Sequence, residues 1–225
     1  MRLLALDTSL GACSVALLDG GQVTHTRHVA MGRGQAEAIV PLVAELMAEA
    51  GLAVGALERI VVTTGPGSFT GVRIGLAAAQ GLALPDDLAV VGIETTAVFF
   101  EMAQPIAKAG AQNVVVAIDG GRRDLYLACD PGRETVSRLA DEAADVLPPG
   151  PMLLAGNGAE KLKAALPAGL AARASLPDPA RCGPYPDAAA LARLGARAPA
   201  PDHAPGPVYL HPPYAKTPLN GGRVI

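Results

Sequence analysis

Short apolar runs broken by turn residues open the chain. Residues 3–6 form an apolar run that ends at Asp7, and residues 14–18 form a second run that ends at Asp19. Two glycines follow Asp19, and residues 22–30 then alternate between polar and apolar side chains, as a half-exposed strand does. This pattern predicts a meander of three consecutive strands.

Helical spacing appears after the meander. Apolar residues recur every three or four positions over about 35–50, which predicts an amphipathic helix ended by Gly51. The pattern downstream predicts a strand at 60–63, a helix over 70–84, a strand at 89–93 and a helix from 96 that Pro105 breaks.

The second half repeats part of this pattern. Residues 114–118 form an apolar run that ends at Asp119, about 112 residues after Asp7, and a glycine turn and a second apolar run follow again. We therefore predict two lobes of related construction, residues 1–110 and 111–225. The second lobe is expected to contain a strand, turn and helix from 152, a last helix capped by Asp187 and running to about 197, and an extended proline-rich tail from about 199.

Composition favours packed α/β layers. Half of the 225 residues are hydrophobic, 17% are charged and only 3% are aromatic, so Leu, Val, Ile and Ala must build the core. The net charge is −3, and the 18 Lys and Arg residues are scattered along the chain. A protein that grips nucleic acid alone usually carries a basic stripe. We therefore expect another subunit to hold any RNA.

The cysteine count and the hydropathy pattern indicate a soluble cytoplasmic protein. Cys13, Cys129 and Cys182 lie too far apart for a disulfide framework or a zinc site, so we expect reduced, partly buried thiols. No stretch approaches the roughly 18 uninterrupted apolar residues of a membrane span. Asp7 also interrupts the first apolar run, so a secretory core is missing.

The two aspartates at strand ends are candidates for binding a nucleotide. Asp7 and Asp119 each follow a buried strand, at the sheet edge where open α/β sheets bind ligands. This layout resembles that of the acetate kinase, actin and hexokinase superfamily, in which paired aspartates face each other across a cleft and hold metal-bound phosphates. The alternative is that both aspartates only cap turns.

The glycine-rich loop before the second predicted helix is a candidate anion site. Gly65 and Gly67 permit a tight turn, and Ser68 or Thr70 can cap the helix that follows. Such a loop at a helix N-terminus can bind phosphate. It is no Walker loop, because no Lys-Ser or Lys-Thr follows the glycines.

Small residues form a strip along this helix. Gly71, Gly75 and Ala79 lie four positions apart, and glycine inside a helix costs about 0.5–1 kcal/mol relative to alanine. We interpret the strip as a place where another backbone approaches closely. Either a partner protein covers it or the helix at 35–50 does.

Searches for a metal site or a nucleophile find no motif. The four histidines include no His-x-x-x-His pair, and His25 and His28 are expected on opposite faces of a strand. No Ser or Cys has a recognisable base partner in the sequence.

The loop and the helix after it carry a family resemblance. Residues 64–75 read Thr-Gly-Pro-Gly-Ser-Phe-Thr-Gly-Val-Arg-Ile-Gly, which resembles the signature of the TsaB (YeaZ) family of glycoprotease-like proteins. Residues 4–9 and 12–17, Gln-Gly-Leu-Ala at 80–83, Ala-Ile-Asp at 117–119 with Tyr126, and Pro-Val-Tyr-Leu at 207–210 also match. The resemblance therefore covers nearly the whole chain.

The resemblance implies a two-lobed α/β fold of the actin-like superfamily, with a ribonuclease H-like motif in each lobe. It implies a non-catalytic scaffold required by TsaD, the catalytic paralogue that transfers threonylcarbamoyl to the adenosine next to the anticodon of tRNA. The helices at 35–50 and 70–84 would pair with TsaD or, in the chain alone, form a homodimer. The interface residues expected on them are Ile39, Leu42, Val43, Leu46, Gly71, Arg73, Gly75 and Ala79.

Further partners and cofactors are implied in the same way. A TsaE-like ATPase would be another partner, and tRNA would be contacted only indirectly. The chain would have no cofactor of its own, with ATP or ADP and a metal ion at or through TsaD. If nucleotide touches this chain, Asp7, Gly65, Gly67 and Asp119 are the expected contacts.

Two positions depart from the family, and one alternative function stays open. Relatives often have a histidine where this chain has Gln35, and a basic residue where it has His211. The loss of the histidine at 35 weakens any metal or protease interpretation. The alternative is a stand-alone enzyme, either an ATP-dependent phosphotransferase that uses Asp7 and Asp119 or a metallopeptidase-like enzyme.

Overall fold

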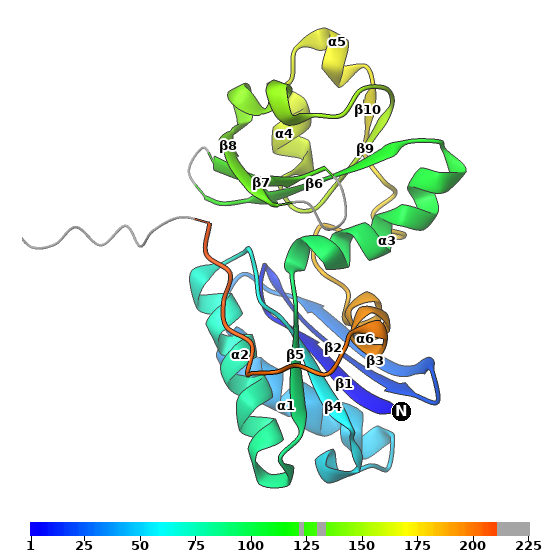
Figure 1. Ribbon diagram of the computed structural model, residues 1–225, viewed down its shortest axis with the longest axis vertical. Coiled ribbons are helices and arrows are strands. Elements are labelled where there is room, and N and C mark those ends of the chain that lie inside the picture. The colour runs from blue at the N-terminus through cyan, green and yellow to red at the C-terminus, as the bar shows by residue number, and fades with distance from the viewer. Residues whose placement is uncertain (122–123, 130–133, 211–225) are drawn as a thin grey trace, which may run out of the picture.

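The computed structural model describes residues 1–121, 124–129 and 134–210, which form two lobes (Figure 1). Each lobe contains one five-stranded sheet. The first sheet has the order β3-β2-β1-β4-β5, with β1 (Arg2–Asp7), β2 (Ala12–Asp19), β3 (Gln22–Ala30), β4 (Arg59–Thr63) and β5 (Ala89–Ile93). The first three strands pair antiparallel, which confirms the predicted meander, and β4 and β5 run parallel to β1.

The second sheet has the same order and strand directions. Its strands are β6 (Asn113–Asp119), β7 (Asp124–Ala128), β8 (Val136–Leu139), β9 (Met152–Ala155) and β10 (Ala174–Ser175), arranged β10-β9-β6-β7-β8. The β6–β7 and β7–β8 pairs are antiparallel, whereas β9 is parallel to β6 and to β10. Strands β1 and β6 therefore hold equivalent places. This equivalence confirms the predicted repeat and the ribonuclease H-like motif in each lobe.

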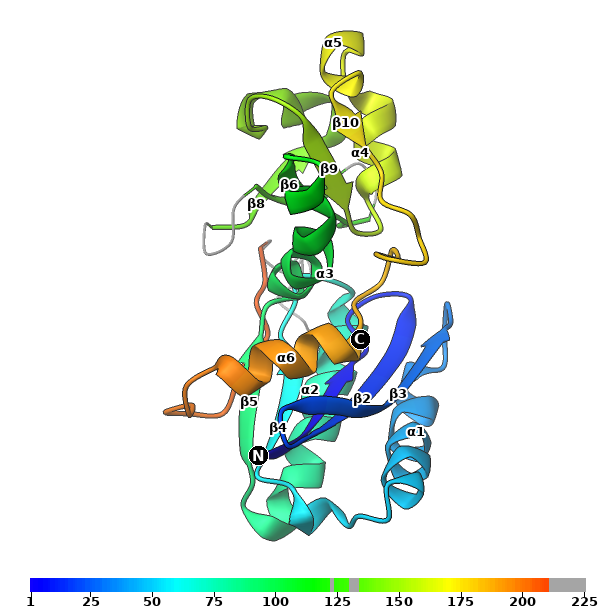
Figure 2. The ribbon, with the colours of Figure 1, turned by 90° about the vertical axis from the view of Figure 1, so that its right-hand side faces the viewer.

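Helices cover both faces of the first sheet. α1 (Gln35–Glu49) and α2 (Phe69–Ala83) pack against the face formed by Leu4, Leu6 and Val62. α6 (Ala188–Arg197) packs against the opposite face, on Leu3, Ala5 and Val61 (Figure 2). The lobe is therefore a three-layer α/β/α sandwich.

Helices also cover both faces of the second sheet. α3 (Thr95–Ala109) lies between the lobes and packs Phe99 and Ala103 on one face. α4 (Ala159–Ala165), α5 (Ala168–Ala171) and a 3₁₀ helix at Ala140–Val146 cover the other. Shorter 3₁₀ helices lie at Val54–Ala56 and Leu84–Asp86.

Two predictions about elements were wrong. Pro105 does not break its helix, because α3 continues through it and packs Ala103 and Ala107 on the second sheet. The second lobe does not keep all the residues after 110, since α6 returns to the first lobe. The backbone N–H of Ala188 donates to Ser14 Oγ (2.9 Å), and Arg59 Nη1 donates to the carbonyl of Gly195 (3.1 Å).

The segment after α6, residues 199–210, contains neither helix nor strand, and we call it the strap. It runs from α6 past β5 to α2 (Figure 1). The N–H of Val208 donates to the carbonyl of Thr64 (2.8 Å), and Gln80 Nε2 donates to the carbonyl of Pro205 (3.4 Å). His211 and the rest of the proline-rich tail lie outside the described residues.

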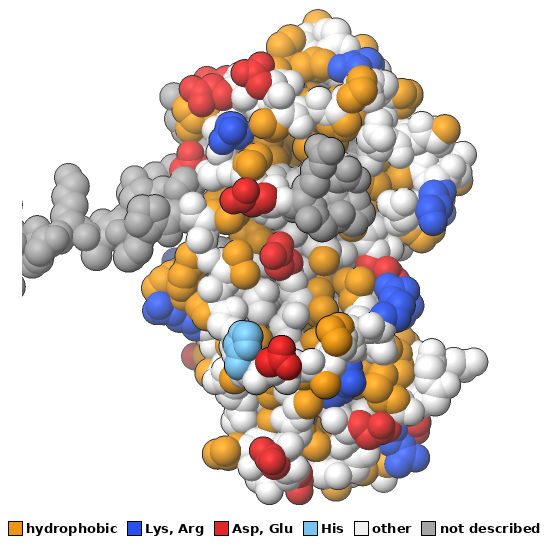
Figure 3. Space-filling view, viewed as in Figure 1, with side chains coloured by type: hydrophobic (Ala, Val, Ile, Leu, Met, Phe, Trp, Pro, Cys, Tyr) orange, Lys and Arg blue, Asp and Glu red, His pale blue; other side chains and the backbone are white. Residues whose placement is uncertain are grey.

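The surface agrees with the scattered charge seen in the sequence. On the face shown in Figure 3, Lys and Arg side chains are dispersed over both lobes rather than gathered in a stripe. None of the helices in the described part of the chain combines the length and the apolar character that crossing a membrane requires.

Candidate functional site

Asp7 ends β1 in a fully buried position. Its Oδ1 accepts hydrogen bonds from the backbone N–H of Ser9 (3.1 Å), from Ser9 Oγ (2.6 Å) and from Thr63 Oγ1 (2.5 Å). Its Oδ2 has no hydrogen-bond partner among the described residues. Burial raises the pKa of the Asp7 carboxyl, and the hydrogen bonds from Ser9 and Thr63 act in the opposite direction.

Asp119 ends β6 at the equivalent place but is half-exposed. Its Oδ1 accepts from Lys161 Nζ (2.8 Å) and from the backbone N–H of Gly121 (3.0 Å). Its own N–H donates to Asn157 Oδ1 (2.9 Å). The repeat therefore places two aspartates at matching sheet edges, with one enclosed and the other paired with a lysine.

The glycine-rich loop lies directly over the end of β1. The N–H of Ser68 donates to the carbonyl of Ser9 (2.8 Å), and Ser68 Oγ accepts from the N–H of Gly71 (3.3 Å), which confirms Ser68 as the helix cap. Gly65 has a φ of 96°, which glycine adopts without strain, and precedes a cis peptide bond to Pro66. At Gly67 a Cβ would collide with the carbonyl oxygen of Ser9.

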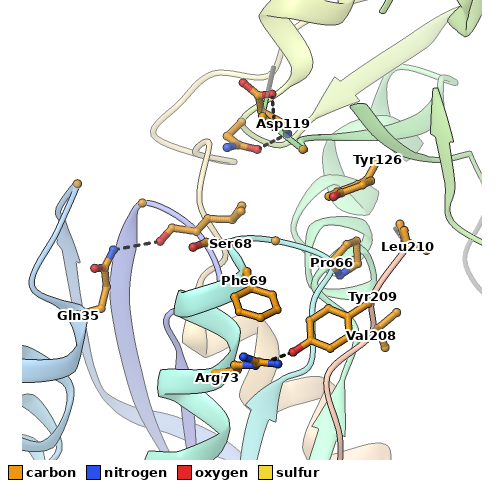
Figure 4. A pocket seen from close by; sticks show the side chains of 17 residues that line it. Gln35, Pro66, Ser68, Phe69, Arg73, Asp119, Tyr126, Val208, Tyr209 and Leu210 are labelled. Carbon is orange, nitrogen blue, oxygen red and sulfur yellow. Dashed lines mark hydrogen bonds between the residues drawn. The ribbon is translucent and has the colours of Figure 1, made fainter. Parts of the chain in front are cut away.

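A cleft of about 900 Å³ opens between the lobes above this loop (Figure 4). Its walls come from the first lobe, from the second lobe and from the strap. The lining residues are Leu10, Gly11, Gly32, Gln35, Pro66, Gly67, Ser68, Phe69, Arg73, Asp119, Gly120, Gly121, Tyr126, Asn157, Val208, Tyr209 and Leu210.

The cleft brings together only part of the predicted nucleotide site. Gly67 and Asp119 line it, whereas Asp7 and Gly65 are buried and do not. The expectation that Asp7 and Asp119 face each other across a cleft was therefore wrong. Asp119 lines the cleft, but the glycine-rich loop, which packs on Thr8 and Ser9, encloses the Asp7 side chain.

Three side chains at the cleft form what we call the aromatic clasp: Phe69, Arg73 and Tyr209. The guanidinium carbon of Arg73 lies 3.7 Å from the centroid of the Phe69 ring, and Arg73 Nε donates to Tyr209 Oη (2.7 Å). The Phe69 and Tyr209 rings stack with their centroids 5.5 Å apart. Sequence reasoning missed this cluster, although both of its segments belonged to the family signature.

The glycine strip of α2 faces the chain's own sheet, so its assignment to a partner surface was wrong. A Cβ at Gly71 would collide with the carbonyl oxygen of Thr8, and one at Gly75 would lie 2.8 Å from Thr8 Oγ1. Ala79 is also fully buried. The backbone that approaches the strip is the end of β1, neither α1 nor a second protein.

The predicted contacts on α1 are corrected for the same reason. Ile39, Val43 and Leu46 are buried in the core of the lobe, and Leu42 is partly buried against it. Amphipathic helices turn their apolar stripe toward their own sheet. Arg73 is exposed, but it belongs to the aromatic clasp.

Several apolar and small residues are nevertheless exposed on or beside the same two helices. Val40 is 49% exposed, and Leu84, just after α2, is 81% exposed. The small residues Ala44, Ala77 and Gly81 are exposed between them, and α1 and α2 pack side by side. We call the surface formed by Val40, Ala44, Ala77, Gly81 and Leu84 the outer face.

Gln35 and the cysteines, which the sequence also singled out, have structural roles or buried positions. Gln35 Nε2 donates to the carbonyls of Met31 (3.3 Å) and Leu10 (3.4 Å), so this residue ties the start of α1 to the cleft wall. Cys129 Sγ donates to the carbonyl of Val146 (3.2 Å), and burial raises the pKa of Cys13 and of Cys182 to about 11. Within the described residues, no group of three or more His, Cys, Asp or Glu is placed to hold a metal ion.

Comparison with known proteins places this geometry in a family. The family model described as TsaD, tRNA N6-adenosine threonylcarbamoyltransferase, matches residues 29–181. The TsaB proteins of Haemophilus influenzae and Escherichia coli, named for tRNA threonylcarbamoyladenosine biosynthesis, are 41% and 40% identical over 128 and 129 residues. These alignments cover 57% of this chain but only 53% and 54% of the two proteins, about half of their length.

Solved structures extend the similarity to nearly the whole chain. YeaZ from Pseudomonas aeruginosa is 30% identical, with a TM-score of 0.71 over 93% of this chain and 99% of that one. An activator of 2-hydroxyisocaproyl-CoA dehydratase from Clostridium difficile is 11% identical, with a TM-score of 0.53, and shares the two-lobed actin-like fold alone. The chain, which the TsaD family model also matches, therefore belongs to the TsaB (YeaZ) family.

Proposed function

We propose that the chain is a non-catalytic partner subunit in the synthesis of threonylcarbamoyladenosine in tRNA, required by a TsaD-like catalytic subunit. The similarity to TsaB proteins named for that process supports the role. The match to the TsaD family model supports a partner of related fold, because a two-fold pair uses the same surface patch on both subunits and a protein of related fold offers an equivalent patch.

The outer face is the observation that carries this proposal. A surface helix normally directs polar side chains outward, yet Val40 on α1, Ala77 on α2 and Leu84 just after α2 are exposed. Small side chains such as Ala44 and Gly81 let the backbone of another helix approach closely. The outer face thus takes the place of the buried residues first expected at the interface.

The geometry does not favour the alternative of a stand-alone phosphotransferase. A catalytic carboxylate must reach the reacting group, and Asp7 is enclosed beneath the loop. Asp119 lines the cleft, but Lys161 already engages its Oδ1.

The other expected partners and cofactors follow from the same role. We expect ATP or ADP and any metal ion to be held by the TsaD-like subunit or at its junction with this chain. A TsaE-like ATPase would join that assembly, and the isolated chain would form a homodimer through the outer face. Contact with tRNA would be indirect and the assembly cytoplasmic.

Charge placed on the outer face tests the proposal. We expect Ala77→Glu to weaken binding to the TsaD-like protein of the same organism by at least about 100-fold, because a buried unpaired carboxylate is costly. Ala168→Glu, an exposed alanine on α5 of the other lobe, is the matched control and should bind like the wild type.

Isothermal titration calorimetry with purified proteins measures both affinities, and circular dichroism checks that each variant folds. Undiminished binding by Ala77→Glu would contradict the interface. No binding by the wild-type chain would contradict the partner role itself.

A further inference from the structure

The Arg73 side chain brings an uncompensated positive charge to the cleft. None of the ion pairs among the described residues involves Arg73. The other charged residue that lines the cleft, Asp119, is paired with Lys161. When Lys161 is counted with Asp119, the charges of that ion pair cancel, and Arg73 leaves one net positive charge at the cleft among the described residues.

The aromatic clasp holds this guanidinium in one orientation. Phe69 covers one of its faces at 3.7 Å, and the bond to Tyr209 Oη engages Nε. No other hydrogen bond of the Arg73 side chain occurs within the described ranges, so Nη1 and Nη2 keep their donors. An arginine that is already ordered loses less entropy when it binds a ligand, and its two terminal nitrogens suit a carboxylate or phosphate.

The surroundings of the clasp favour an anion with an apolar body. Arg73 lies in the first turns of α2, a helix of 15 residues whose N-terminus adds positive potential. The nearby lining is mostly apolar, with Pro66, Tyr126 and Val208 (Figure 4). The volume of about 900 Å³ lies within the range of small-molecule sites.

We propose that the interlobe cleft binds a small organic anion, with its carboxylate or phosphate group on Nη1 and Nη2 of Arg73 and its apolar or aromatic body against the lining. The strap completes this site, because Val208, Tyr209 and Leu210 form one of its walls. The proposal goes beyond the partner role and does not depend on it.

Four probes applied to the intact chain test the site by two-dimensional NMR. Phenyl phosphate and benzoate carry both an anion and a ring, benzyl alcohol has the ring alone, and inorganic phosphate has the anion alone. We expect phenyl phosphate or benzoate to shift the amide resonances of Gly67 and Gly120, and to bind at least about tenfold more tightly than the two partial probes. Whichever of the two binds more tightly identifies the anionic group.

Variants separate the clasp from general charge effects. Arg73→Gln should weaken the binding of the anionic probes by about tenfold and leave the binding of benzyl alcohol unchanged. Tyr209→Phe keeps the ring and should weaken the binding of the anionic probes by about threefold. Arg193→Gln, which removes an exposed arginine of α6, is the matched control and should bind like the wild type. Equal affinity of Arg73→Gln and wild type, shifts confined to residues outside the cleft, or no shift up to millimolar probe would overturn the proposal.

Discussion

At the scale of single residues, the two halves of the repeat have diverged in their aspartates. Asp7 is enclosed and receives three hydrogen bonds at Oδ1, while Oδ2 remains without a partner in the described structure. Asp119 is open to the cleft and paired with Lys161. The same position in the motif therefore organises a loop in one lobe and forms part of a cleft wall in the other.

The burial of Asp7 predicts a distinct dependence of stability on pH. Its raised pKa means that the folded chain holds this proton more tightly than the unfolded chain. The corresponding stability is fully present below the unfolded pKa near 3.8 and is lost as the pH rises through the raised value. Asp7→Asn cannot titrate, so its free energy of unfolding minus that of the wild type should become more positive as the pH rises from 4 to 8.

Urea denaturation at several pH values measures this difference. A constant offset between variant and wild type at every pH would mean that the Asp7 carboxyl titrates alike in the folded and unfolded chains. Asparagine cannot form all the hydrogen bonds that Asp7 forms. This loss shifts the free-energy difference by the same amount at every pH and leaves its trend with pH unchanged.

At the scale of elements, α2 has three sides with different surroundings. Its buried side carries Gly71 and Gly75 against the end of β1, one exposed edge meets the strap, and the rest forms part of the outer face. Glycine stands at these two positions, in spite of its free-energy cost inside a helix, because no larger side chain fits against Thr8.

Two alanine substitutions in this one helix separate packing from helix propensity. Gly71→Ala should destabilise the fold by about 1–3 kcal/mol, because its Cβ meets the backbone of Thr8, which cannot move aside as a flexible side chain can. Gly81→Ala, with no atom within 4 Å of the new Cβ, should stabilise it by about 0.5–1 kcal/mol. Chemical denaturation measures both, and a stabilising Gly71→Ala would show that β1 and α2 can separate at little cost.

At the scale of the whole molecule, periodicity was a better guide to elements than to their neighbours. The strands of the first sheet, the strands β6, β7 and β9, the helices α1 and α2, and the cap at Asp187 follow from local pattern, whereas β8 and β10 were not predicted. Asp187 Oδ1 does accept from the N–H of Ala189 (2.9 Å). The small residues of α2 indicated a close approach but not the identity of the approaching backbone. The return of α6 and the bond from Arg73 to Tyr209, 136 positions apart, depend on long-range packing that no local window contains.

The return of α6 predicts that one substitution in the last helix loosens the first lobe. A Cβ at Gly195 would collide with the side chain of Val61 on β4, so Gly195→Ala should cost about 1–3 kcal/mol. Hydrogen exchange should show faster exchange in β1 and β4, with β6 and β9 unchanged. Gly169→Ala on α5, where nothing lies within 4 Å, is the control. Equal acceleration in both sheets would mean that the lobes unfold as one unit.

Because α6 comes late in the chain, the first lobe is completed late during synthesis on the ribosome. The first sheet is complete once β5 has emerged, but the layer that covers Leu3, Ala5 and Val61 follows only after the entire second sheet has been made. At roughly 5–20 residues per second, that apolar surface waits on the order of 5–20 s for its cover. A nascent chain of this design therefore passes through a long interval in which a chaperone can recognise it, and its N-terminal half reaches its final form only after α6 has emerged.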